Sequence, residues 1–246
     1  MSIWTFVVGH FIWQLAGQGT QEIGKTDQMS PSAVASSFRL KSDFVETQFD
    51  QRFSNDEDVK CEILGTKIVG VSQTKGSLVA KIEQADGNAR VQCTLKGLIE
   101  CENKGKNGPA QIDSQTTSSF TAVKVVSFDG QRFTSRPTEL HLETVVLITK
   151  VDTNLTGLKG VLVRRVASVQ AEATKEEVRN IAEEMTKKRL VEKIDSEFES
   201  QLAPINSALQ FCRSCFLSLG NREVQISTRS IDKDIEVAIV LTANPR

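Results

Sequence analysis

Tyrosine is absent from the chain, and tryptophan occurs only twice. Tyrosine and tryptophan form many of the stacking platforms of single-strand nucleic-acid binders and the contact patches of many binding proteins. The 30 basic and 31 acidic residues leave a formal net charge of −1, so the chain as a whole does not attract nucleic acid or an anionic membrane. The composition therefore predicts that nucleic acid is not a partner.

Histidine is also scarce, because only His10 and His141 are present. A Ser-His-Asp or Cys-His arrangement needs a histidine base that a third group orients. His141 alternates with Leu140 and Leu142, so we expect it on the solvent side of a strand. Walker A and Rossmann glycine patterns are missing as well. The sequence thus predicts a protein that is not an enzyme and that uses no cofactor and no metal.

Long apolar runs are lacking, since the stretch 3–16 is shorter than the roughly 20 residues that span a bilayer. Small residues lie at and after its end, at Ala16, Gly17 and Gly19, and they favour a signal peptide that comprises residues 1–19. A buried N-terminal element is the alternative. No segment after residue 18 is apolar enough for a transmembrane helix. We expect an exported bacterial protein of the periplasm or cell envelope.

The segment 20–37 is polar and without a clear period, which is typical of a flexible linker. A single domain is expected over 38–246. At its start, apolar residues at near-helical spacing predict a short amphipathic helix carrying Phe38, Phe44, Val45, Phe49 and Phe53.

Alternating apolar residues then predict strands in "VKCEIL", "SLVAKIE" and "ARVQCTL". Glycines between these runs favour hairpins. The acidic group 56–58 is predicted to form a solvated turn. Further β-branched runs predict strands in "SFTAVKVVSF", "ELHLETVVLIT", "GVLVRRVASV", "EVQIST" and "IEVAIVLT". Arg164 and Arg165 fall in the third of these runs, where they would protect an edge strand from pairing. The pattern indicates an antiparallel sheet.

The stretch "CEILGTKIVGVSQTKGSLVAKI", followed by "SSFTAVKVVSFDGQRF", resembles a group of uncharacterised exported β-rich proteins common in planctomycete-type bacteria. The resemblance covers roughly residues 36–216. It implies export and a β-then-helix layout, and it supplies no activity or catalytic residues.

A long amphipathic helix is predicted after the strands, in "TKEEVRNIAEEMTKKRLVEKIDSEFESQL". Thr174 and Glu177 form a capping-box pattern. Asp195 and Glu199 are expected on the exposed side, and Pro204 is expected to end or kink the helix before it resumes toward Gly220. Apolar residues recur at threes and fours and form one stripe: Val178, Ile181, Met185, Leu190, Val191, Ile194, Phe198 and Leu202.

Cys212 and Cys215 have the spacing of a thiol pair, but they fall late in the helical pattern rather than at a helix start. Two interpretations stay open. The pair forms a disulfide or redox-active dithiol, or the two side chains are small apolar groups without special chemistry.

The predicted fold is α+β, with a mainly antiparallel curved β-sheet or open barrel packed against a long C-terminal helix kinked near Pro204. The predicted function is non-enzymatic binding or scaffolding with an unknown protein or apolar small-molecule partner. The alternative is a carrier that holds a lipid-like ligand between sheet and helix. A helix that protrudes to dock a partner protein is a third interpretation. The residues expected to touch the sheet or the ligand are Ile181, Met185, Ile194, Phe198 and Leu202.

Overall fold

The structure, a computed structural model, describes residues 33–43, 51–85, 88–220, 222–231 and 234–243. Its strands and helices confirm an α+β fold with an antiparallel sheet and one long helix. In chain order the elements are β1 (Ala33–Leu40), β2 (Gln51–Ile63), β3 (Thr66–Glu83), β4 (Ala89–Asn107), β5 (Ala110–Phe128), β6 (Phe133–Ser135), β7 (Glu139–Thr153), α3 (Gly157–Ala173), α4 (Lys175–Gly220), β8 (Arg222–Ile231) and β9 (Asp234–Ala243).

The larger sheet is an antiparallel meander that curves into a half-barrel. Its strand order is β2-β3-β4-β5-β6, and β7 pairs with β5 along the same edge as β6. The pairing of β5 with β7 shifts register between Asp113 and Ser114, where the hydroxyl of Thr149 donates to the carbonyl of Asp113 at 3.0 Å. Such a bulge increases local twist, so it contributes to the curvature of the sheet.

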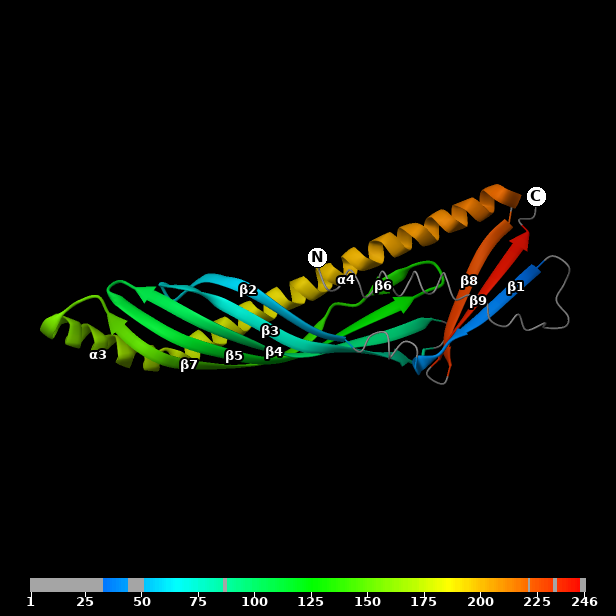
Figure 1. Ribbon diagram of the computed structural model, residues 1–246. Helices are drawn as coiled ribbons and strands as arrows, with labels where there is room; N and C mark the ends of the chain where they lie inside the picture. Colours follow the sequence, from blue (N-terminus) through cyan, green and yellow to red (C-terminus); the bar gives the residue numbers. More distant parts are fainter. Residues whose placement is uncertain (1–32, 44–50, 86–87, 221, 232–233, 244–246) are drawn as a thin grey trace.

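A smaller sheet of order β1-β9-β8 lies at the other end of the molecule from α3 (Figure 1). Two buried hydroxyls of β8 join it to the half-barrel. The backbone N–H of Ala89 donates to Oγ1 of Thr228 at 3.1 Å, and the N–H of Arg90 donates to Oγ of Ser230 at 3.4 Å. Ile235 of β9 is buried within the main core. The two sheets are therefore packed together.

Helix α4 runs along the concave side of the half-barrel for most of the length of the molecule (Figure 1). Ile194 and Phe198 are buried together with inward-facing strand residues such as Leu95 and Phe120. Burying each of these helix side chains stabilises the fold by about 1.5–3 kcal/mol. These residues of α4 therefore cover the buried part of the inner face of the sheet.

Several predicted boundaries differ from the structure. The run "GVLVRRVASV" was predicted as a strand and instead lies in α3, so an edge-strand role for Arg164 and Arg165 is wrong. Phe38 lies in β1 and Phe53 in β2 rather than in a helix, while 44–50 lie outside the described residues. The acidic group 56–58 belongs to β2, not to a turn.

The predicted N-terminal segments are described only in part. The predicted signal peptide, 1–19, and most of the predicted linker lie outside the described residues, whereas 33–37 belong to β1. None of the described helices is long and apolar enough to cross a membrane.

The start of α4 differs from the predicted capping box in its side-chain contact. Lys175 is the first helical residue, and the N–H of Val178 donates to the carbonyl of Thr174 at 2.9 Å. The hydroxyl of Thr174, however, donates back to the carbonyl of Gln170 in α3 at 3.0 Å. Thr174 thus joins two helices rather than capping one.

Pro204 does not end α4, which continues through it to Gly220. At 1.5 Å per residue, 46 residues make a rod of about 69 Å. Such a rod exceeds a compact globule of this size, and the molecule is accordingly elongated along α4 (Figure 1).

Candidate ligand-binding trough

A cavity of about 500 Å³, which we call the trough, lies between the inner face of the half-barrel and α4. Its apolar walls come from four strands of the meander, from β7 and from one side of the helix. The apolar side chains that line it are Phe53, Val59, Cys61, Ile63, Ile68, Leu95, Ile99, Cys101, Phe120, Val146, Val178, Ala182, Met185, Leu190, Ile194 and Phe198.

The trough exists because small side chains meet across neighbouring strands of the inner face. Ser72 of β3 pairs with Cys101 of β4, which pairs with Thr116 of β5, and Asn103 of β4 pairs with Ser114 of β5. All five residues line the trough. These rows stand opposite the first half of α4, and they leave space that the helix does not occupy.

Aromatic rings line the trough at its other end. Phe53, Gly76, Gly97 and Phe120 form one cross-strand row, in which each ring lies over a glycine. Ring carbons of Phe120 lie 2.7 Å from the position that a Cβ of Gly97 would take. In the rows beyond, residues such as Ala80 and Cys93 are buried in the core. The space between sheet and helix is therefore open in one half and filled in the other.

The rim of the trough is charged. Glu57 of β2, the edge strand, accepts a hydrogen bond from Lys193 of α4. This bond holds the pKa of Glu57 below its ordinary value, against the opposite effect of partial burial, and the nearby Arg189 acts in the same direction as Lys193. Asp58 and Glu197 also line the rim. An amphipathic molecule could thus place its polar head here, in contact with water.

Past the aromatic end, a buried ion pair joins the sheet to the helix. Nζ of Lys124, whose side chain is 2 % exposed, lies 2.5 Å from Oδ1 of Asp195. Thr138 donates to the same carboxylate from its hydroxyl at 2.5 Å and from its N–H at 3.2 Å. Burial raises the pKa of Asp195, but the hydrogen bonds from Lys124 and Thr138 outweigh it and leave the pKa below its ordinary value.

Asp195 was predicted on the exposed side of the helix, and this prediction is wrong. Glu57 was likewise read as part of a solvated turn. The sequence contained a signal for the ion pair of Asp195. Lys124 continues the inward-facing alternation of Phe120 and Ala122, and a lysine at an inward position needs an anionic partner.

One polar atom inside the trough has no hydrogen-bond partner among the described residues. Nδ2 of Asn103 donates to Oγ1 of Thr116 at 3.2 Å, whereas Oδ1 of Asn103 is buried and unpaired. An unpaired buried acceptor is destabilising by about 1–3 kcal/mol.

Two thiols of the half-barrel have a raised pKa. Burial raises the pKa of Cys93 to about 12 and also raises that of Cys61, which lines the trough. Cys61, Cys93 and Cys101 are free thiols. Cys212 and Cys215 both lie in α4, and their side chains are outside those that the structure describes.

Only some of the residues that were proposed from the sequence for ligand or sheet contact line the trough. Met185, Ile194 and Phe198 line the trough. Leu202 is buried further along α4, and Ile181 is half-buried and does not line the cavity. The lining residues that come from the strands, together with Ala182 and Arg189 of α4, were not predicted from the sequence.

His141 lies on the outer face of β7, as predicted, with its side chain 78 % exposed and 3.4 Å from Glu143. This exposed position, outside any pocket lining described above, differs from that of a catalytic base, which must reach a bound substrate. Among the residues that the structure describes, no three His, Cys, Asp or Glu side chains are grouped closely enough to hold a metal ion.

The trough is thus an apolar cavity with a charged rim, formed by residues from most of the chain. Comparison of the chain with protein-family models, with curated proteins and with solved structures found no match.

Proposed function

We propose that the protein binds a lipid-like amphipathic molecule in the trough, as a carrier rather than as an enzyme. The observation that carries the proposal is an apolar cavity of about 500 Å³ between sheet and helix. Sites for small molecules typically measure about 300–1,000 Å³, are mostly apolar and contain a few polar groups. The predicted export would place such a carrier at the cell envelope.

The distribution of polar groups supports an amphipathic ligand over a wholly apolar one. The carboxylate and cations of Glu57, Arg189 and Lys193 lie at the rim, while Ile99, Leu95 and Met185 line the interior. A hydrocarbon tail would replace water along the interior, and a polar head would remain hydrated at the rim.

A cavity-filling variant tests the proposal. Ala182→Trp places an indole in the trough, whereas Glu184→Trp places the same group on the exposed side of α4. In titrations with a dansyl-labelled long-chain fatty acid, we expect wild type and the Glu184→Trp control to bind with similar Kd. Ala182→Trp should weaken binding at least about tenfold, which corresponds to about 1.4 kcal/mol.

Native mass spectrometry of protein purified from its own host provides an independent measurement. A carrier should retain an apolar molecule that dissociates on unfolding. Bare protein, together with fatty-acid binding that Ala182→Trp leaves unchanged, would contradict the proposal.

A further inference from the structure

Helix α3 exposes apolar side chains on the side that faces away from the protein. Leu158 is 89 % exposed, Leu162 65 %, Val166 56 % and Val169 66 %. At 3.6 residues per turn these four side chains fall within about 80° of one another. We call them the α3 stripe. Surface helices normally turn their apolar side toward the core, so α3 has the reverse arrangement.

The opposite side of α3 packs onto the protein through small residues. Gly160 is buried, and a Cβ there would lie 2.1 Å from the carbonyl oxygen of Leu155. Ala167 and Ala171, two and three turns further along, are half-buried. The outward orientation of the stripe therefore follows from close packing of the other face.

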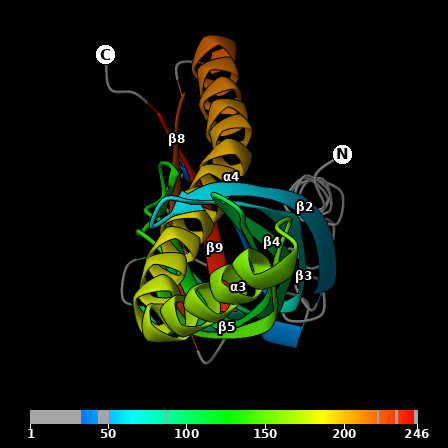
Figure 2. The same cartoon turned by 90° about the vertical axis from the view of Figure 1, so that its left-hand side faces the viewer.

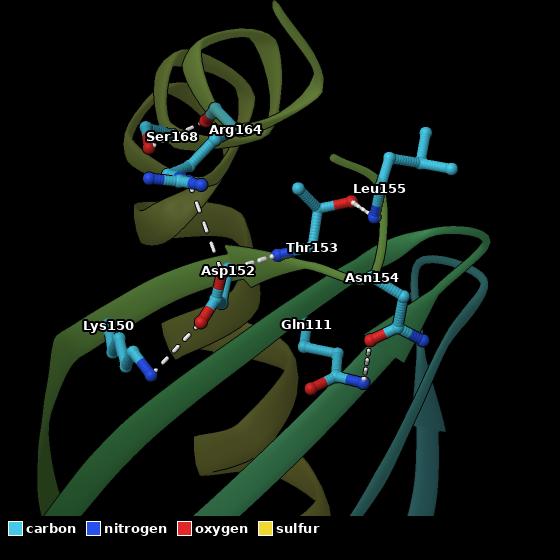
Figure 3. A network of polar contacts seen from close by, with 8 residues as sticks. All are labelled: Gln111, Lys150, Asp152, Thr153, Asn154, Leu155, Arg164 and Ser168. Atoms are coloured by element: carbon cyan, nitrogen blue, oxygen red, sulfur yellow. Dashed lines mark hydrogen bonds and ion pairs between the residues drawn. The ribbon is translucent and has the colours of Figure 1, made fainter. Parts of the chain in front are cut away.

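One exposed ion pair joins α3 to β7 (Figure 3). Asp152, near the end of β7, lies 3.0 Å from Nζ of Lys150 and 4.0 Å from Nε of Arg164 in α3. The hydroxyl of Ser168 donates to the carbonyl of Arg164 at 2.8 Å. Arg164 is thus directed toward the sheet, away from the stripe.

The charges beside the stripe are mainly basic. The ionisable side chains of α3 are Lys159, Arg164, Arg165 and Glu172, and Glu172 pairs with Lys175 of α4 at 3.4 Å. Lys159 and Arg165 flank the stripe, each within roughly 20° of one edge of it. Both are exposed, and neither forms an ion pair with a described residue. An apolar stripe bordered by basic side chains is the pattern of helices that lie in the headgroup region of anionic bilayers.

The position of α3 relates this surface to the trough. It lies at one end of the molecule and is the element nearest the viewer in Figure 2. Thr174 joins it directly to α4, whose Val178 and Ala182 line the trough. We propose that α3 docks the protein on an anionic membrane surface, with the α3 stripe in the headgroup region and Lys159 and Arg165 on lipid phosphates.

Vesicle flotation of the full-length protein tests this proposal. The probes are vesicles of phosphatidylcholine alone and of equal parts phosphatidylcholine and phosphatidylglycerol. We expect wild type to float with the anionic vesicles and to dissociate as salt is added. The double variant Lys159→Gln/Arg165→Gln should bind them roughly 30-fold more weakly.

Substitution of the stripe by an uncharged polar residue separates apolar insertion from charge. Leu162→Gln/Val166→Gln should abolish flotation. The matched control is Val145→Gln/Leu147→Gln on β7, where the wild-type residues are 66 % and 55 % exposed, and it should float like wild type. Every variant carries the apolar stretch 3–16, so differences between them report on α3.

Three outcomes would overturn the proposal. Wild type does not float with anionic vesicles, the stripe variant floats as well as wild type, or light scattering shows a dimer that only the stripe variant dissociates. The last result would identify a self-association face. The experiments distinguish membrane docking from ligand binding, because the Ala182→Trp variant should lose fatty-acid binding and still float with anionic vesicles.

Discussion

Lys124 is among the most completely buried side chains that the structure describes, although it is charged. An isolated buried ammonium would be strongly destabilising, so its surroundings must compensate. Asp195 supplies the counter-ion, Thr138 supplies two further donors to that carboxylate, and the ring of Phe198 lies 5.9 Å from Nζ. The arrangement fixes how α4 sits along β5.

Asp195→Asn tests this pair. The variant leaves Lys124 buried without a carboxylate, and losing one partner of a buried pair typically costs about 3–5 kcal/mol. We expect the free energy of unfolding at neutral pH, measured with urea, to fall by about 3 kcal/mol. Glu199→Gln, an exposed change one turn along, should alter it by less than about 0.5 kcal/mol. Equal effects of the two changes would contradict a structural role for the pair.

The same comparison has a pH dependence. Because the folded pKa of Asp195 is lowered, its stabilising effect is present above the unfolded value of about 4. The effect is lost as the pH falls through the folded pKa. The stability difference between wild type and Asp195→Asn should therefore shrink in acid, when both are measured in urea from neutral pH down to below about pH 4. A constant difference would mean that Asp195 acts only through its shape.

At the scale of elements, glycines set how closely neighbouring strands and rings approach. Gly76 and Gly97 pair across β3 and β4, and the rings of Phe53 and Phe120 cover them from the outer neighbours. A side chain at either glycine would occupy the position of a ring. The aromatic end of the trough therefore depends on two residues that carry no side chain.

Gly97→Ala should displace the ring of Phe120 and strain the backbone of β3, because the new Cβ would lie 2.7 Å from carbons of the ring and 2.6 Å from the carbonyl oxygen of Lys75. Overpacking of this kind costs about 1–3 kcal/mol. Gly105→Ala is the control, since the new Cβ would lie 2.9 Å from a methyl group of Thr66, and the Thr66 side chain can rotate away. Thermal unfolding of the two variants should show a clearly larger loss for Gly97→Ala. The reverse order would mean that the ring moves freely.

The strand alternation predicted the meander because each apolar run faces one side, as Val59, Cys61 and Ile63 do. Helix α3 was predicted as a strand for a physical reason. Val161 and Val163 alternate and are β-branched, whereas the packed face of α3 consists of small residues that give no apolar signal. Periodicity assumes that apolar side chains point inward, and those of α3 point outward.

At the scale of the whole molecule, the length of α4 requires an elongated shape, whereas the sequence predicted that the helix would end or kink at Pro204. The trough could not be predicted from the sequence. Its volume depends on cross-strand pairs such as Ser72 and Cys101, which join residues 29 positions apart. Whether such pairs leave space is decided by register, and register is not readable from any single strand.

The two sheets are joined at the start of β4, where backbone N–H groups donate to hydroxyls of β8. The hydroxyl of Thr228 accepts from the N–H of Ala89 at 3.1 Å and donates to the carbonyl of Phe128 at 3.2 Å. Thr228→Val keeps the shape and removes both bonds, which should cost about 1–3 kcal/mol because the N–H of Ala89 is buried.

We expect this loss to be local. Hydrogen exchange followed by mass spectrometry should show faster exchange in β8 and β9 of Thr228→Val, with little change in the central strands β4 and β5 away from their junction with β8. Ser227→Ala, which alters the neighbouring exposed residue, should exchange like wild type. The three-stranded sheet would then be a separate unit of stability, held to the half-barrel through Thr228 and Ser230. Equal acceleration in all strands would show instead that both sheets open together and that the junction is no weaker than the meander itself.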